Sequence, residues 1–238
     1  MLQEKLIVRL AQFRIGSPHP LQTAQRMGHP AANMRKQIIV AIVSIVIVAL
    51  MGRAVFLAAE NHQQKQMAYE CLQKIESLSL GVSTFSDAQE LARRYSGLPW
   101  SASAQQAECS IQDCNLRFVF QNNWIGLFRT GKKVSLVAAL WVKNGYVASK
   151  EVDYSVMSKS EYSQFFYFLL DQRTVIGAKG YEVRKAQLDE RNVPHVLKVT
   201  LSPEAPPEVR AKAYTLDLTC LSRLYGCNDG LSIFPSGL

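Results

Sequence analysis

Residues 38–52 read IIVAIVSIVIVALMG, a run of fifteen residues without a charge. Arg53 interrupts the run, and residues 54–59 continue its apolar character. Residues 37–59 number 23, and a helix of that length, at about 1.5 Å per residue, crosses a hydrocarbon layer about 30 Å thick. The sequence therefore predicts a transmembrane helix over residues 37–59, with the lipid bilayer as its partner. We expect Arg53 to lie in the outer third of this helix, where its long side chain reaches the headgroups.

The charges that flank the apolar segment predict its orientation. Residues 1–36 carry six basic residues and one acidic residue, whereas residues 60–78 carry two lysines and three glutamates. Lys and Arg are retained on the cytoplasmic side of a membrane. We therefore expect residues 1–36 to form a cytoplasmic basic tail, residues 37–59 a signal anchor, and residues 60–238 an extracytoplasmic domain.

The apolar segment has two other interpretations, a cleaved signal peptide and a buried core helix. Met34-Arg35-Lys36 and the run behind it have the pattern of a cleaved signal peptide, with Met34 as an alternative translation start. Leu57-Ala58-Ala59 is a poor match to a cleavage site, so we favour the uncleaved anchor. A buried core helix is disfavoured because apolar residues cover every side of the segment. The anchor and the signal peptide both place the main domain outside the cytoplasm.

The net charge of +8 is concentrated in the N-terminal part of the chain. Residues 1–36 account for +5 and Arg53 for +1, which leaves +2 on residues 60–238. Because nucleic-acid-binding domains carry a strongly basic surface of their own, this nearly neutral domain predicts no nucleic-acid partner. The apolar content of 48% and the charged content of 19% exclude an intrinsically disordered chain.

The chain has five cysteines, and the predicted extracytoplasmic location of the domain permits disulfides. Two bridges with one free thiol can be drawn in fifteen ways. We favour Cys109–Cys114 and Cys220–Cys227, because short loops cost little entropy to close. Cys71 then remains a free thiol, buried on a helix face. The spacing of the two pairs lacks the C-x-x-C pattern of a zinc site or a redox-active pair.

Two helices are predicted at the start of the domain. Over residues 60–79 the apolar residues Met67, Cys71, Ile75 and Leu78 follow a helical spacing. Ser86 and Gln89 then form a capping-box pattern. The second helix buries Ala88, Leu91, Ala92 and Tyr95, and ends before Gly97 and Pro99.

Strand signals follow the helices. Leu116, Phe118 and Phe120 alternate with polar residues, and residues 134–142 are apolar on both faces, as in a central strand. Asn144-Gly145 predicts a two-residue hairpin turn, because both residues tolerate positive φ. The register of that hairpin pairs Val142 with Val147, Trp141 with Ala148, and Val137 with Val152. Its second strand then has one polar face and is expected near an edge of the sheet.

The rest of the domain contains further strands and a helix. The aromatic run at residues 162–170 indicates a buried strand or a short helix, and residues 181–188 and 195–201 indicate another hairpin. Residues 206–225 have helical spacing, so we predict a helix there. The fold class is α+β: a single N-terminal transmembrane helix followed by an exterior domain of helices packed on an antiparallel sheet.

Residues 78–91 read LSLGVSTFSDAQEL, in which Gly81 separates the two predicted helices. With the element order that follows, this segment resembles the helix–glycine–helix start of small two-helix, three-strand envelope domains, such as outer-membrane assembly lipoproteins. The similarity covers about residues 72–156. It implies architecture only, because the chain has no lipoprotein cysteine after its apolar run.

The sequence contains no recognisable catalytic motif. H-E-x-x-H and G-x-S-x-G are absent, and the segment 177–180 is too short for a phosphate-binding loop. The carboxylate pairs Asp87/Glu90 and Glu151/Asp153 are interpreted as a solvated helix turn and a polar strand face. No catalytic, cofactor-binding or metal-binding residues are predicted.

The expected function is therefore that of a single-pass membrane-anchored envelope protein. Its extracytoplasmic domain would bind a protein partner without catalysis. A pilin-like filament or secretion-system subunit is one alternative, since such subunits also join an apolar helix to an α+β head. A membrane-tethered enzyme with a dispersed active site is the other, and a pocket lined by perturbed titratable groups would favour it.

Overall fold

The structure is a computed structural model, and it describes residues 30–100, 109–122, 133–157, 162–188 and 194–223. The chain forms two compact units, Met1–Val48 and Ala49–Leu238. The first unit contributes the N-terminal part of one long helix. The second unit holds the remainder of that helix, the sheet and the core.

Helix α1 (Pro30–Ser77) runs without interruption for 48 residues. Its N-terminal part, from Met34, is long and apolar enough to cross a membrane, and none of the side chains in its most apolar stretch is buried. The prediction of a long apolar N-terminal helix is confirmed. Residues 1–29 of the predicted basic tail lie outside the described residues.

The last turns of α1 belong to the core of the second unit. Ala68, Cys71, Leu72 and Ile75 are at most 1% exposed and form one stripe along the helix. This stripe confirms the helix predicted over residues 60–79 and the burial of Cys71. Because these four apolar side chains are buried, this part of α1 is held by tertiary packing rather than by helix propensity alone.

Helix α2 (Phe85–Tyr95) begins at a capping box formed by Thr84 and Asp87. The Thr84 hydroxyl accepts a hydrogen bond from the Asp87 backbone N–H at 3.3 Å, and the Asp87 carboxylate accepts one from the Thr84 backbone N–H at 2.7 Å. The predicted capping box of Ser86 and Gln89 is therefore wrong by two residues. The Asp87 carboxylate bonds back to the backbone N–H of Thr84, and its negative charge also interacts favourably with the N-terminal end of the helix dipole. The uncharged Gln89 side chain lacks this second interaction. The predicted inner stripe is confirmed for Ala88, Leu91 and Tyr95, which are buried.

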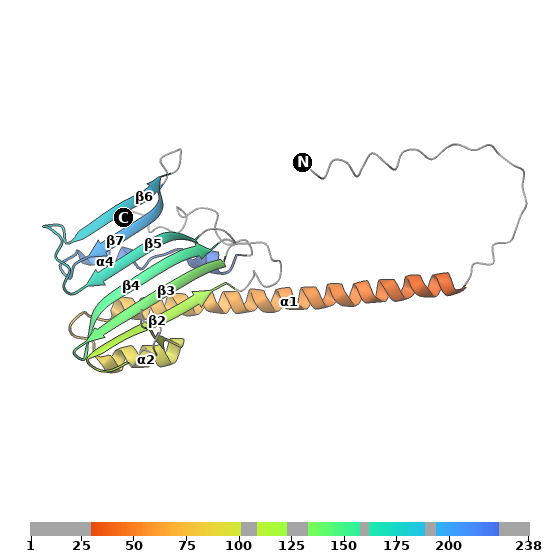
Figure 1. The fold of residues 1–238 in the computed structure, drawn as a ribbon, viewed down its shortest axis with the longest axis horizontal. Helices are drawn as coiled ribbons and strands as arrows, with labels where there is room; N and C mark the ends of the chain where they lie inside the picture. Colours follow the sequence, from red (N-terminus) through yellow and green to blue (C-terminus); the bar gives the residue numbers. More distant parts are fainter. Residues whose placement is uncertain (1–29, 101–108, 123–132, 158–161, 189–193, 224–238) are drawn as a thin grey trace, which may run out of the picture. The chain divides into compact units, whose positions relative to one another are not determined.

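In the described residues, seven strands form one mixed sheet in the order β1-β2-β3-β4-β5-β7-β6. Figure 1 shows β2, β3, β4, β5, β7 and β6 side by side in this order. Their bounds are β1 (Leu98–Pro99), β2 (Asp113–Gln121), β3 (Lys133–Lys143), β4 (Tyr146–Met157), β5 (Tyr162–Asp171), β6 (Tyr181–Leu188) and β7 (Pro194–Leu201). The hairpin predicted from residues 181–188 and 195–201 is confirmed as β6 and β7. The aromatic run is confirmed as strand β5, with Phe166, Phe168 and Leu170 buried.

The prediction of an antiparallel sheet is wrong for one pair of strands, because β5 pairs with β7 in parallel. The chain leaves β5 for the outer strand β6 and returns as β7 between the two. Strand β6 carries the exposed charged residues Glu182, Arg184 and Lys185, which suit an edge. Strand β4 lies between β3 and β5, so its predicted position near an edge is wrong.

A bulge also changes the register of β4 against β3. The turn forms as predicted, with φ of 52° at Asn144 and 83° at Gly145, and Val142 pairs with Val147. The register then shifts between Trp141 and Val142, so that Trp141 pairs with Ser149 and Val137 with Asp153. The predicted pairs Trp141–Ala148 and Val137–Val152 are therefore wrong. One extra residue on β4 exchanges the side chains that share a face with β3.

One hydrophobic core joins the inner face of the sheet to α1, α2 and the C-terminal segment. Two tyrosines form hydrogen bonds between elements that pack on this core. Tyr69 of α1 accepts a hydrogen bond from the Leu218 backbone N–H at 3.2 Å, and the Tyr95 hydroxyl donates to Glu70 at 3.3 Å. The helices thus cover one face of the sheet, as the α+β prediction requires.

The C-terminal segment differs from the single helix predicted over residues 206–225. It contains helix α4 (Pro207–Lys212) and the 3-10 helix η1 (Leu218–Leu221). The Asp217 side chain accepts a hydrogen bond from the Thr219 backbone N–H at 2.8 Å. Such local side-chain bonding competes with a continuous helix, and it starts a new element at Leu218.

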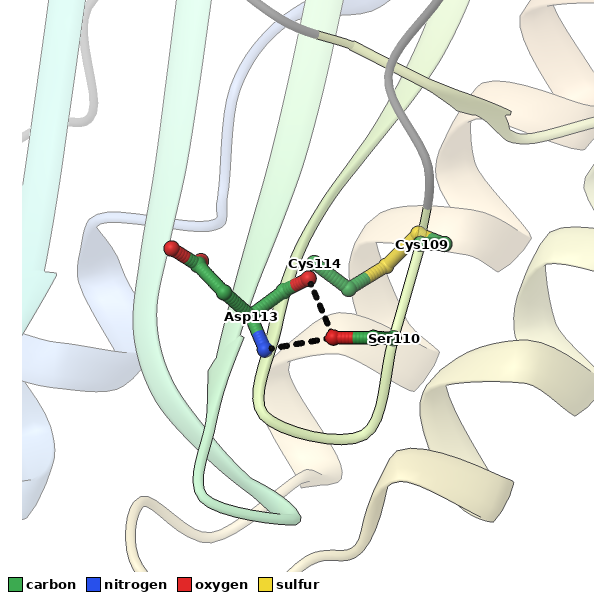
Figure 2. Close-up of a disulfide and its surroundings, with 4 residues drawn as sticks. All are labelled: Cys109, Ser110, Asp113 and Cys114. Atoms are coloured by element: carbon green, nitrogen blue, oxygen red, sulfur yellow. Dashed lines mark hydrogen bonds between the residues drawn. A yellow bond between two sulfur atoms is a disulfide. The ribbon is translucent and has the colours of Figure 1, made fainter.

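The predicted bridge between Cys109 and Cys114 is confirmed. Figure 2 shows it closing a short loop at the start of β2, in which the Ser110 hydroxyl bonds to the backbone N–H and carbonyl of Asp113. Cys71 is free and buried, as predicted. Cys220 is disulfide-bonded, and its predicted partner Cys227 lies outside the described residues.

Thiol counting tests this cysteine assignment. Cys71 is 0% exposed and burial raises its pKa to about 12, so it should not react with an impermeant thiol reagent in the folded protein. We expect no reactive thiol per native chain and one per chain after unfolding in denaturant without reductant. Mass spectrometry after labelling should place that thiol at Cys71. Labelled Cys220 and Cys227 in the unfolded chain would contradict the Cys220–Cys227 bridge.

Candidate functional site

A cavity of about 420 Å³ lies beside the C-terminal end of α1. Its wall comes from three regions far apart in the sequence: the end of α1 with the turn after it, the strands β4 and β5, and the segment that contains α4. The polar side chains that reach it include Glu76, Lys150, Arg210 and Tyr214. The apolar residues in its lining are Leu78, Leu80, Leu170, Pro203, Pro207 and Ala211.

Lys150 is a buried lysine in the middle of the sheet. It lies on β4 and is only 2% exposed. Its Nζ donates to the backbone carbonyl of Glu76 at 2.9 Å and also to that of Leu78. Carbonyls at a helix C-terminus lack partners within the helix, and a cation there also interacts favourably with the helix dipole. Lys150 therefore caps the C-terminal end of α1 from the sheet.

The surroundings of Lys150 make its ammonium form costly. Burial, together with the nearby Arg210 guanidinium, lowers the pKa of Lys150 to about 8. The Glu76 carboxylate opposes this shift. Because lysines titrating near neutral pH concentrate at functional sites, Lys150 marks the cavity as the leading candidate.

Two more donors of the cavity have no acceptor within the described part of the chain. The Tyr214 side chain is 6% exposed, and its buried hydroxyl makes no hydrogen bond there. The buried Nε of Arg210 also has no partner among those residues. The Tyr214 ring packs edge-to-face on Phe168, with centroids 4.9 Å apart, and lies 5.8 Å from Lys150 Nζ. Packing thus positions the ring and leaves its hydroxyl without an acceptor.

A second group of side chains lies on the outer face of the sheet. The Arg117 guanidinium stacks 3.3 Å from the centre of the Trp100 ring. Burial raises the pKa of Glu151, and the positive charge of Arg117 opposes this shift. The Tyr167 hydroxyl donates a hydrogen bond to the Glu151 carboxylate. Burial also raises the pKa of Tyr167 to about 12. Glu151 is half-buried and lies on the polar face of β4, as the sequence indicated.

The structure does not bring the predicted site residues together into one site. The Cys109–Cys114 bridge lies at the start of β2, whereas Cys220 lies in η1. Asp87 of the first predicted carboxylate pair is exposed and serves the capping box of α2. Over residues 30–223, leaving out the gaps in the description, no group of three or more His, Cys, Asp or Glu side chains is placed to hold a metal ion.

Sequence reasoning missed Lys150, Arg210 and Tyr214. A signal for Lys150 was present, since it alternates in step with Val152 and Tyr154, which are both fully buried. A lysine on the inward face of a central strand requires a buried acceptor. Its acceptors lie 74 and 72 residues away, so the sequence carried no sign of them.

The comparisons with known proteins add nothing to this geometry. The chain matches no protein-family model, no curated protein and no solved structure.

The depressed pKa of Lys150 predicts a pH dependence of stability. The folded protein releases the Lys150 proton near pH 8, whereas the unfolded chain holds it to about 10.5. The unfolded state then binds this proton over a wider range, so the contribution of Lys150 to the free energy of unfolding should rise with pH, by about 2–3 kcal/mol between pH 7 and 10. Chemical denaturation between pH 7 and 10 measures this rise.

The Lys150→Met variant keeps a long apolar side chain and removes the titrating amine. We expect it to lose the rise, and the exposed Lys179→Met variant to keep it. Equal slopes for wild type and Lys150→Met would contradict the assignment.

Proposed function

We propose that the chain is a single-pass membrane-anchored envelope protein with an extracytoplasmic domain that binds a protein partner. The observation that carries the anchor is the exposure of α1. Over residues 38–56 its large apolar side chains are about half exposed or more. A helix that is apolar on all sides needs a surrounding that is not water, and a lipid bilayer provides one.

The proposed orientation is supported by flanking charge. Arg35 and Lys36 precede the apolar segment directly, and Glu60 follows it. Retention of the basic end in the cytoplasm places residues 60–238 on the opposite side. The Cys109–Cys114 bridge fits that side, because disulfides persist in oxidising compartments.

The proposal that the anchor stays uncleaved is supported by the residues around Ala59. Leu57 is 9% exposed and Asn61 is fully buried, and both lie on the face of α1 that carries Ala68. Helix α1 continues through this region without a break. A protease acting near Ala59 would have to unwind a part of the helix that is packed in the folded unit.

Protein binding is supported by a patch on the outer face of the sheet, here called the Arg117 patch. It consists of Arg117 with three exposed apolar neighbours: Leu98 at 69%, Trp100 at 38% and Val119 at 50%. Leu98 pairs with Arg117, and Val119 lies two residues further along β2, so all of them share one face. Aromatic residues and Arg are enriched where proteins bind one another.

The two alternatives differ in their support. The cavity beside Lys150 is lined by a titratable group with a shifted pKa, which favours a ligand site in the domain. The pilin-like alternative stays a prediction, since no observation in the described residues favours it.

Impermeant labelling tests the anchor and its orientation. Val175 is 94% exposed, so Val175→Cys should react with a membrane-impermeant maleimide on intact cells or spheroplasts. Ser17→Cys, in the basic tail, should react only after lysis. The protein should also stay in the membrane pellet after an alkaline wash. The reverse labelling pattern would contradict the orientation, and release by the wash would contradict the anchor.

Site-specific photocrosslinking tests the binding surface. A photoreactive amino acid in place of Val119 should yield an adduct of defined mass in native membranes, with one protein identified by mass spectrometry. The same substitution at Val175, an exposed residue away from the patch, should yield none. The absence of an adduct at residue 119, or equal adducts at both positions, would contradict binding through the Arg117 patch.

A further inference from the structure

We propose that the cavity beside the C-terminal end of α1 binds the carboxylate of a small aliphatic acid. Three residues that carry hydrogen-bond donors line it, each from a different segment: Lys150 from β4, Arg210 from α4, and Tyr214 from the segment after α4. This assignment goes beyond the proposed function, since it concerns the interior of the domain and holds whether or not the chain is anchored.

The donors of the cavity exceed its acceptors. The Lys150 ammonium has three N–H groups, of which the carbonyls of Glu76 and Leu78 take two. The third N–H remains, as do the buried Arg210 Nε–H and the Tyr214 O–H, which have no acceptor in the described ranges. Buried polar groups in folded proteins nearly always have a partner. A carboxylate has about four lone-pair sites, which is enough for all three donors.

The charge around the cavity also favours an anion. Lys150 and Arg210 contribute two positive charges, and Glu76 contributes one negative charge. The Glu76 side chain is exposed to solvent, which screens it, whereas Lys150 is buried. The cavity therefore carries an excess of about one positive charge. A single carboxylate balances it, whereas a dianionic phosphate would leave a buried negative charge.

The remainder of the lining favours an aliphatic body for the ligand. Leu78, Leu80 and Leu170 line the cavity together with Pro203, Pro207 and Ala211. Its volume of about 420 Å³ lies in the range of small-molecule sites, about 300–1,000 Å³. Apolar walls with a few convergent donors are the usual composition of a site for a small organic ligand.

Calorimetric titration of the full chain in detergent micelles tests the proposal, with sodium pentanoate as the probe. We expect saturable binding of pentanoate and at least tenfold weaker binding of pentanol, which has the same chain without the charge. Inorganic phosphate should bind at least tenfold more weakly than pentanoate. Binding of pentanol as tight as that of pentanoate, tighter binding of phosphate, or no binding of pentanoate at 20 mM would each overturn the proposal.

Three variants locate the binding. Tyr214→Phe removes only a hydroxyl that bonds to nothing in the described structure, so the variant should fold and bind pentanoate at least fivefold more weakly. Arg210→Met should weaken binding by a larger factor. Arg184→Met, at an exposed arginine on β6, should bind like the wild type. Wild-type affinity in Tyr214→Phe and Arg210→Met would overturn the assignment to this cavity, as would an equal loss in Arg184→Met.

Discussion

The contact on which the domain depends most is the one between the Lys150 ammonium and the last carbonyls of α1. A helix that ends inside a protein leaves carbonyls without partners, and burying them unpaired is unfavourable. Lys150 reaches them from the central strand β4, so one side chain ends the helix and joins it to the sheet. The apolar stripe of Ala68, Cys71, Leu72 and Ile75 then packs the preceding turns against the same core. The buried charge that results is the reason why the adjoining cavity differs chemically from the rest of the interior.

The bulge between Trp141 and Val142 decides which side chains can make that contact. Alternation along β4 places Lys150, Val152 and Tyr154 on one face, and Glu151 and Asp153 on the other. In the shifted register Val152 and Tyr154 lie opposite Ala138 and Leu136, which are fully buried. Lys150 therefore points inward with them. The same shift brings Glu151 to the outer face, near Arg117 and Tyr167. The placement of Lys150 at the cavity and of Glu151 on the outer face both fit this shifted register.

These two faces assign separate roles to parts of a small domain. The inner face, covered by α1 and α2, holds the core and at its end the cavity with its excess of donors. The outer face carries an aromatic–arginine pair beside exposed apolar residues. A ligand in the cavity would contact the end of α1 and the strand β4 directly, so its binding would stabilise the contact that joins them. The proposed anchor and the proposed ligand site thus involve opposite ends of the same helix.

Local chemistry was enough to predict the features that depend on near neighbours in the chain. The apolar run, the stripe of α1, the alternation in β2, the Asn144-Gly145 turn and the Cys109–Cys114 bridge each involve residues that are adjacent or a few positions apart. Tertiary structure alone decided the bulge, the parallel pairing of β5 with β7, the break between α4 and η1, and the acceptors of Lys150. These features depend on contacts between segments distant in sequence, whose free energies no local pattern records. The candidate cavity belongs entirely to this second group, because its donors come from β4, α4 and the segment after α4, and they meet only when the sheet and α1 have packed together.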